Sequence, residues 1–181
     1  MSQTPEQVAL KALQRRISAS PNLVWLQTLL RCDTGDPVGP EVLGSSLICL
    51  YFSASWCPPC HYFAPILAQA YKQIRETHGP NSFEVILIPL DTDENMWQLH
   101  MAKMPWFSIP LRKREAIVKL FTTFSVVEAP RLVVLDSIGS VICENARGGE
   151  GFGFGCNPLR AYDKLMEDLS KLQAERKEQI P

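Results

Sequence analysis

The sequence predicts an α/β fold in which a central mixed β-sheet is flanked by helices. Two apolar runs, 47–52 and 83–88, lack the alternation of a half-exposed strand, so each is typical of a strand buried on both faces of a sheet. Between them, apolar residues recur at helical spacing from Tyr62 to Ile74, which indicates a helix of about 17 residues starting near Pro58. Strand, helix and strand together predict a βαβ unit.

Three further segments complete the predicted sheet and its helices. A short helix capped by Asp93 or Thr92 follows the second strand, and residues 114–124 repeat the helical pattern. Residues 131–135 and 140–143 are two strand-like runs separated by a Gly-containing turn. We expect them to form an antiparallel hairpin that closes one edge of the sheet.

Both ends of the chain predict helices outside this unit. Thr4 opens a capping box with a proline at the first helical position, and the Gly- and Pro-rich stretch 33–40 indicates a linker. An apolar stripe after Asn157 predicts an amphipathic helix, which we expect to fray from Ala174 onward. The predicted organisation is an N-terminal helical extension over 1–36, the α/β domain over 37–156, and a C-terminal helix and tail over 157–181.

Composition narrows the classes of partner. The 181 residues are 46% hydrophobic and include 18 Lys and Arg against 19 Asp and Glu, a net charge of −1. Because the chain has no excess of basic residues, we expect neither a nucleic acid nor a membrane as a partner. No apolar run approaches the ~20 residues of a spanning helix, and the start has no secretion signal, so we expect a cytoplasmic protein.

Only two of the six cysteines stand close together, as the Cys-X-X-Cys of Cys57 and Cys60. A structural zinc site needs four ligands, and because no second such pair exists, we expect no metal. The pair follows the strand 47–52 and precedes the next helix, a junction where open α/β sheets place their chemistry. Cys49 is predicted to lie in the core, and the remaining three are expected to be spare: Cys32, Cys143 and Cys156.

The position of the pair predicts its chemistry. Free backbone N–H groups and the dipole at a helix start favour a thiolate at Cys57, and such sites lower a thiol pKa from about 8.5 to roughly 3.5–7.5. Cys57 is therefore predicted to attack a disulfide and the more sheltered Cys60 to resolve the mixed disulfide, with no other cofactor. Pro58 and Pro59 stiffen the turn, and Trp56 is either an apolar docking rim, which we favour, or a core lid.

The run from Tyr51 through Trp-Cys-Pro-Pro-Cys, followed by Phe63 and Pro65, resembles the thioredoxin superfamily. It is closely similar to the tryparedoxins of trypanosomatids and the related nucleoredoxins, because ordinary thioredoxins carry Gly-Pro between the cysteines. Further matches extend the resemblance over about residues 40–147. The resemblance implies a thioredoxin-like fold and a thiol-disulfide oxidoreductase.

The resemblance also implies roles for individual residues. Pro130 is the expected cis-proline facing the disulfide, although a proline before a strand is by itself more often trans. Tyr51 falls where tryparedoxins carry a tyrosine; its phenol is a poor base at neutral pH, and a purely structural role is equally open. Arg147 matches an arginine that receives the anionic groups of a glutathione-type substrate; by itself it is an ordinary surface arginine.

Several positions depart from the family pattern near the expected docking surface. His61 stands where arginine is common, Leu90 where tryparedoxins carry tryptophan, and Ala129 where an isoleucine usually precedes the cis-proline. A solvent-facing His61 is the simpler interpretation; a protonated ring would add charge near the thiolates. The Gly148–Gly155 segment is unlike the family, and we expect a flexible connector there.

Three functions are compatible with these observations. The leading hypothesis is a monomeric tryparedoxin-type reductase that passes electrons from a low-molecular-weight dithiol, of the trypanothione or glutathione type, to protein disulfides such as peroxiredoxins. The second is a nucleoredoxin-like regulatory reductase with a narrow range of partners. The third is a binding or scaffold module with incidental cysteines. The cysteine pair argues against it, because a scaffold has no physical need for two reactive thiols at a helix start.

Overall fold

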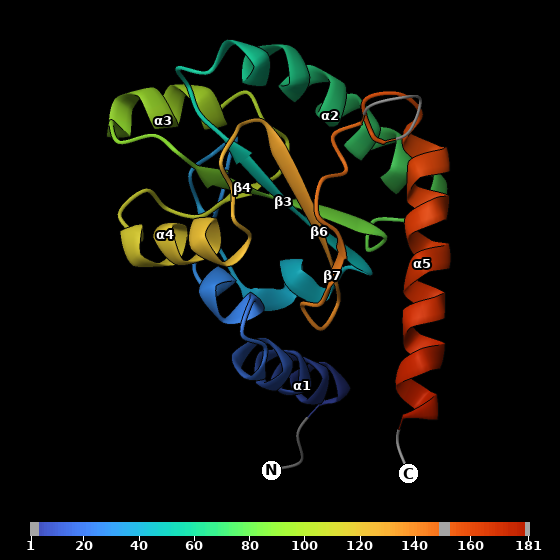
Figure 1. Ribbon diagram of the computed structural model, residues 1–181. Coiled ribbons are helices and arrows are strands. Elements are labelled where there is room, and N and C mark those ends of the chain that lie inside the picture. Colours follow the sequence, from blue (N-terminus) through green and yellow to red (C-terminus); the bar gives the residue numbers. More distant parts are fainter. Residues whose placement is uncertain (1–3, 149–152, 180–181) are drawn as a thin grey trace.

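The computed structural model describes residues 4–148 and 153–179. Within these residues one sheet runs in the order β2-β1-β5-β4-β3-β6-β7, with helices around it (Figure 1). The strands are β1 Leu29–Arg31, β2 Pro37–Val38, β3 Leu47–Ser53, β4 Phe83–Pro89, β5 Phe107–Ser108, β6 Arg131–Asp136 and β7 Val141–Cys143. The helices are α1 Pro5–Ala19, α2 Pro58–His78, α3 Glu94–Met101, α4 Arg114–Thr123 and α5 Pro158–Glu178, with short 3₁₀ helices η1 Leu23–Leu26 and η2 Pro40–Gly44.

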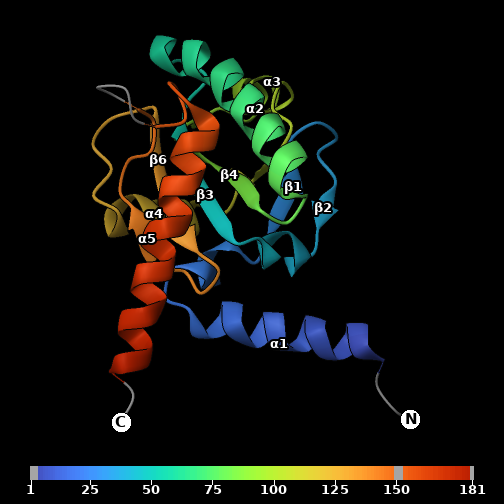
Figure 2. The ribbon, with the colours of Figure 1, turned by 90° about the vertical axis from the view of Figure 1, so that its right-hand side faces the viewer.

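The two central strands form the core that the apolar runs predicted. Every residue of β3 and β4 is buried, and the two strands pair in parallel from Leu47 opposite Phe83. Successive side chains of a strand point to opposite faces. Tyr51 accordingly packs on Phe63 of α2, while Phe52 packs on Phe121 of α4. These two helices therefore cover opposite faces of the sheet, and α5 lies beside α2 (Figure 2).

Most predicted elements are confirmed. Thr4 forms the capping box of α1, and Asp93 caps α3 through the backbone N–H of Met96. The hairpin of β6 and β7 is antiparallel and closes one edge of the sheet. α2 begins at Pro58 as expected and extends to 21 residues.

The predicted linker over 33–40 was wrong. This segment forms the turn and second strand of a hairpin in which Leu29 pairs with Val38, and β1 also pairs with β5. β1 has three residues and β2 has two, so neither shows a periodicity in the sequence. A two-stranded hairpin is only marginally stable by itself, and the pairing of β1 with β5 adds to its stability. The expected boundary at residue 36 therefore runs through a hairpin that belongs to the sheet.

The C-terminal helix is longer than expected. Fraying was predicted from Ala174, but α5 continues to Glu178, and near its end Arg176 donates to the carboxylate of Asp136 at 2.9 Å. Within the predicted connector Gly148–Gly155, residues 149–152 lie outside the described residues. At its described end Phe154 is buried against the ring of Phe83, which ties this end to the core instead of leaving it flexible.

The described residues contain neither a membrane-spanning helix nor a metal-binding cluster. None of their helices combines the length and the apolar character needed to cross a membrane. No three His, Cys, Asp or Glu side chains in the described part of the chain are grouped so that they could hold a metal ion.

Candidate active site

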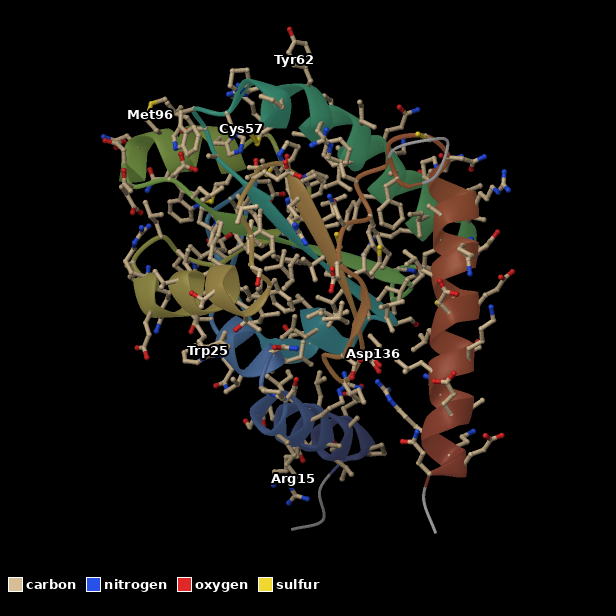
Figure 3. All side chains as sticks on the ribbon, in the orientation of Figure 1. Arg15, Trp25, Cys57, Tyr62, Met96 and Asp136 are labelled. Atoms are coloured by element: carbon tan, nitrogen blue, oxygen red, sulfur yellow. A yellow bond between two sulfur atoms is a disulfide. The ribbon has the colours of Figure 1, made fainter. Side chains whose placement is uncertain are left out.

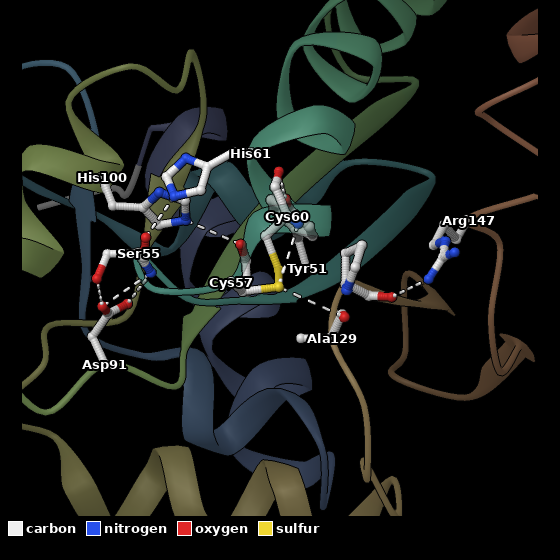
Figure 4. Close-up of a disulfide and its surroundings, with 11 residues drawn as sticks. Tyr51, Ser55, Cys57, Cys60, His61, Asp91, His100, Ala129 and Arg147 are labelled. Carbon is white, nitrogen blue, oxygen red and sulfur yellow. Dashed lines mark hydrogen bonds between the residues drawn. A yellow bond between two sulfur atoms is a disulfide. The ribbon is translucent and has the colours of Figure 1, made fainter.

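Cys57 and Cys60 are joined by a disulfide at the start of α2, and a short loop connects them to the carboxyl end of β3 (Figure 4). Cys57 is the N-cap residue, and its Sγ accepts a hydrogen bond from the backbone N–H of Cys60 at 3.3 Å. Cys57 is 5% exposed and Cys60 is fully buried. After reduction, the same N–H and the helix dipole would stabilise a Cys57 thiolate, as its place at the helix start predicts.

Tyr51 supports the disulfide from the core. Its hydroxyl donates to the carbonyl oxygen of Cys60 at 3.4 Å, from the buried interior of β3. Burial raises the pKa of Tyr51 to about 12. The phenol therefore stays protonated at neutral pH, where it holds the turn and cannot act as a base.

The loop before β6 faces the disulfide. The peptide bond between Ala129 and Pro130 is cis, as the family resemblance implied. The Ala129 carbonyl oxygen lies 3.7 Å from Cys57 Sγ, and Arg147 donates to the Pro130 carbonyl at 3.5 Å (Figure 4). The structure thus brings Arg147, which is distant in sequence, to the edge of the site.

A groove of about 290 Å³ runs beside the nucleophile. Trp56 is 66% exposed and lines this groove, so it forms a rim and not a core lid. Val127, which is 89% exposed, also lines the groove. The remaining lining residues are Cys57, Leu90, Phe121, Val126, Glu128 and Ala129.

Sequence reasoning missed the polar groups that hold the loop in front of Cys57. The Asp91 carboxylate accepts hydrogen bonds from both the backbone N–H and the hydroxyl of Ser55, the former at 3.0 Å. Asp91 is buried just beyond β4, and Arg114 donates to its carbonyl oxygen at 2.8 Å. A carboxylate directly after a buried strand was the available signal, because strand ends at this edge meet at the site.

Two histidines lie on the same side of this loop. His61 is exposed, as expected, but its Nε2 also contacts the Ser55 carbonyl oxygen at 2.5 Å. His100 of α3 is buried, and its Nε2 lies 3.0 Å from the Ser53 hydroxyl. The two rings meet edge to face, with centroids 5.5 Å apart.

The other cysteines have different surroundings. Burial raises the pKa of the thiols of Cys32 and Cys49, and more moderately that of Cys143. Cys156 is exposed, and none of the four is paired. The predicted core position of Cys49 is confirmed. A raised thiol pKa opposes thiolate formation, so these environments differ from the helix start that holds Cys57.

This geometry can be compared with known proteins. Residues 44–141 match a family model described as thioredoxin-like. The chain belongs to the thioredoxin-like family. As a member of it, with the cysteine pair joined at the start of α2, the protein is a thiol-disulfide oxidoreductase with a thioredoxin-like fold.

Relatives place the chain within one branch of the thioredoxin-like family. A tryparedoxin of Trypanosoma brucei brucei is 40% identical over 113 residues, covering 60% of this chain and 76% of the relative. Probable nucleoredoxin 1 of Arabidopsis thaliana is 34% identical over 144 residues, covering 74% of this chain and 24% of the longer relative. A solved structure of tryparedoxin II complexed with glutathionylspermidine is 32% identical, with a TM-score of 0.61 over 75% of this chain and 88% of that chain. The expected relation to tryparedoxins and nucleoredoxins is confirmed.

Proposed function

We propose that the protein is a tryparedoxin-type reductase in which Cys57 is the attacking thiol and Cys60 the resolving thiol. The observation that carries the proposal is the disulfide at the helix start, with Cys57 facing Ala129 and the cis-proline beside an apolar groove. Cys57 is the N-cap, which stabilises its thiolate, whereas Cys60 lies deeper in the fold.

The catalytic cycle moves two electrons and two protons in each half. A thiolate of the dithiol reductant attacks Cys57 Sγ, the intramolecular disulfide breaks, and the Cys60 sulfur leaves and takes a proton. A second thiol, on the same dithiol or on a second molecule of a monothiol such as glutathione, then displaces Cys57, which gives an oxidised reductant and a Cys57 thiolate. That thiolate attacks the target disulfide, and Cys60 finally attacks Cys57 to release the target as a dithiol.

A low-molecular-weight dithiol of the trypanothione or glutathione type is the proposed reductant. A related tryparedoxin was solved with glutathionylspermidine, and Arg147 at the Pro130 carbonyl provides a cation for the carboxylates of such a molecule. The exchange uses the protein's own cysteines, so no bound cofactor is proposed. A dithiol of this kind belongs to a reducing compartment, and we place the protein in the cytoplasm on that basis.

Protein disulfides, such as those of peroxiredoxins, are the proposed targets, and the enzyme is proposed to act as a monomer. Support comes from large apolar side chains exposed at the end of the molecule that holds Cys57, where Tyr62 and Met96 also lie (Figure 3). Tyr62 is 79% exposed, and Trp56 and Val127 flank the groove. Exposed apolar side chains gathered around a reactive group favour contact with another protein surface.

A coupled assay tests the proposal. Reduction of an oxidised peroxiredoxin is measured with trypanothione and its reductase, beside glutathione and thioredoxin-reductase systems. We expect turnover with the low-molecular-weight dithiol and none for Cys57→Ser. In Cys60→Ser the resolving step is lost, so a mixed disulfide with the target should accumulate at Cys57 on a non-reducing gel. Absence of that adduct would remove Cys57 from the attacking role.

The same assay separates a second candidate. The nucleoredoxin match favours a regulatory reductase, and Leu90 and Ala129, both in the groove, depart from the tryparedoxin pattern. If a general disulfide such as that of insulin is reduced as fast as the peroxiredoxin, a narrow partner range is excluded. Turnover driven only by thioredoxin reductase would exclude the trypanothione-type reductant.

A further inference from the structure

Ser55, two residues before Cys57, is held through all of its polar groups. Its N–H and hydroxyl donate to the Asp91 carboxylate, and its carbonyl oxygen contacts His61. The contact with His61 spans the residues that carry the disulfide, because His61 follows Cys60 on α2. Asp91 thus fixes the loop from the end of β4, and His61 fixes it from the helix that the loop leads into.

The chemistry of the contact fixes the tautomer of His61. A carbonyl oxygen can only accept a hydrogen bond, so Nε2 of His61 must carry the proton. The neutral ring with a proton on Nε2 and the imidazolium ion both meet this requirement. The hydrogen bond is therefore available in either protonation state.

His100 holds the exposed ring of His61 in place. The edge-to-face contact at 5.5 Å positions His61 against a ring that is itself buried and bonded to Ser53 of β3. Burial lowers the pKa of His100, so this ring is neutral at physiological pH. Other charged groups near the two rings are the Asp91 carboxylate and Lys103, and Arg114 reaches the Asp91 backbone from α4.

We propose that His61 is a positioning residue for the exchange reaction: its Nε2–H bond to the Ser55 carbonyl, supported by the His100 ring, orients the loop that presents Cys57. The inference rests on the proposed attack by Cys57. Loss of the bond lets the loop before the nucleophile move, which slows the attack without removing either thiol.

The test uses three substitutions of His61 that differ in whether their side chain can place a donor where Nε2 lies. The amide nitrogen of His61→Gln extends about as far along the side chain as Nε2 and restores a donor, whereas that of His61→Asn falls short and His61→Ala has none. We expect the alkylation rate of Cys57 by iodoacetamide, after reduction with dithiothreitol, to be within about twofold of the parent for Gln. It should fall about threefold to tenfold for Asn and Ala, as expected for the loss of one hydrogen bond.

Substitutions at a second site complete the test. Gln and Asn at His78, the far end of the same helix, serve as matched controls and should leave the rate unchanged. Thermal unfolding confirms that each variant is folded.

Each outcome decides the inference. A rate for Asn and Ala equal to the parent shows that His61 does not position the loop, and a Gln variant as slow as Ala shows that the hydrogen bond is not the cause. Neither result depends on a physiological reductant or target. If Cys57→Ser retains the fast-alkylating thiol, the proposed function itself fails, and this result is distinguishable from a failure at His61.

Discussion

Strand β4 has a buried carboxylate near each end, and the two are held in different ways. Glu84, near its start, accepts from the Tyr71 hydroxyl at 3.0 Å and from the Arg75 guanidinium at 3.1 Å. Asp91, just past its end, accepts from the N–H and hydroxyl of Ser55. One carboxylate joins a helix to the sheet through an ion pair, while the other fixes a loop through neutral donors.

The two carboxylates of β4 have different roles: Glu84 contributes to the stability of the fold, and Asp91 to the chemistry at Cys57. At the Glu84 end, a charge is compensated by a charge within the fold, so removing one partner leaves the other uncompensated. At the Asp91 end, the bonds position the backbone before Cys57, where a small movement affects reactivity more than folding. The two ends should therefore respond differently to substitution and to pH.

The largest effect is expected when the ion pair at the Glu84 end is broken. Arg75→Met removes the guanidinium from Glu84 and from the Phe83 carbonyl, and should lower the free energy of unfolding by about 2 kcal/mol. Urea denaturation measures the loss, and disulfide reduction by the folded enzyme should persist. Lys72→Met is the control, because its pair with Glu76 is exposed and is expected to contribute under about 0.5 kcal/mol. Equal losses in the two variants would contradict the distinction.

An intermediate effect is expected in the dependence of stability on pH. Burial lowers the pKa of His100 in the native state below its ordinary 6.5. Between this lowered pKa and 6.5, the unfolded state binds more protons than the native state. The free energy of unfolding should fall as pH drops from 6.5 toward the native pKa.

Burial raises the pKa of Glu84 above 4.5, and just above pH 4.5 the native state therefore binds more protons than the unfolded state. The free energy of unfolding should fall as pH rises from 4.5.

Substituting each residue isolates its contribution to the dependence of the free energy of unfolding on pH. His100→Phe should gain stability relative to the parent as pH falls below 6.5, and Glu84→Gln should gain as pH rises above 4.5. Each difference changes by at most about 1.4 kcal/mol per pH unit. Urea denaturation from pH 4 to 8 provides the curves. Curves parallel to the parent over the whole range would show that neither group is linked to folding.

The smallest effect is expected at the edge of the active site. Arg147→Ala should weaken use of an anionic dithiol by about threefold and leave use of dithiothreitol unchanged, because only the former has carboxylates for the guanidinium. The ratio of kcat/KM for the two reductants measures this. Arg160→Ala, an exposed arginine on α5, is the matched control. The same loss with both reductants would exclude Arg147 from substrate binding.

Long, uniform patterns were predictable from the sequence. The buried strands β3 and β4 and the helix α2 follow from apolar runs and helical spacing, and the place of Cys57 follows from their junction. The hairpin of β1 and β2 was missed because its strands are too short to show a period, and because β1 also pairs with β5, which is distant in sequence. The full length of α5 was missed, and the bond from Arg176 near its end to the distant Asp136 leaves no local signal in the sequence.

The sequence by itself determined the reactive pair, since two thiols at a strand-to-helix junction acquire their chemistry from local backbone N–H groups and the helix dipole. Only the tertiary structure decided what surrounds that pair. Asp91, His100 and Arg147 come from different elements and reach the site by folding. Hydrogen bonds between residues far apart in sequence depend on how strands and helices pack, and no local pattern encodes that packing.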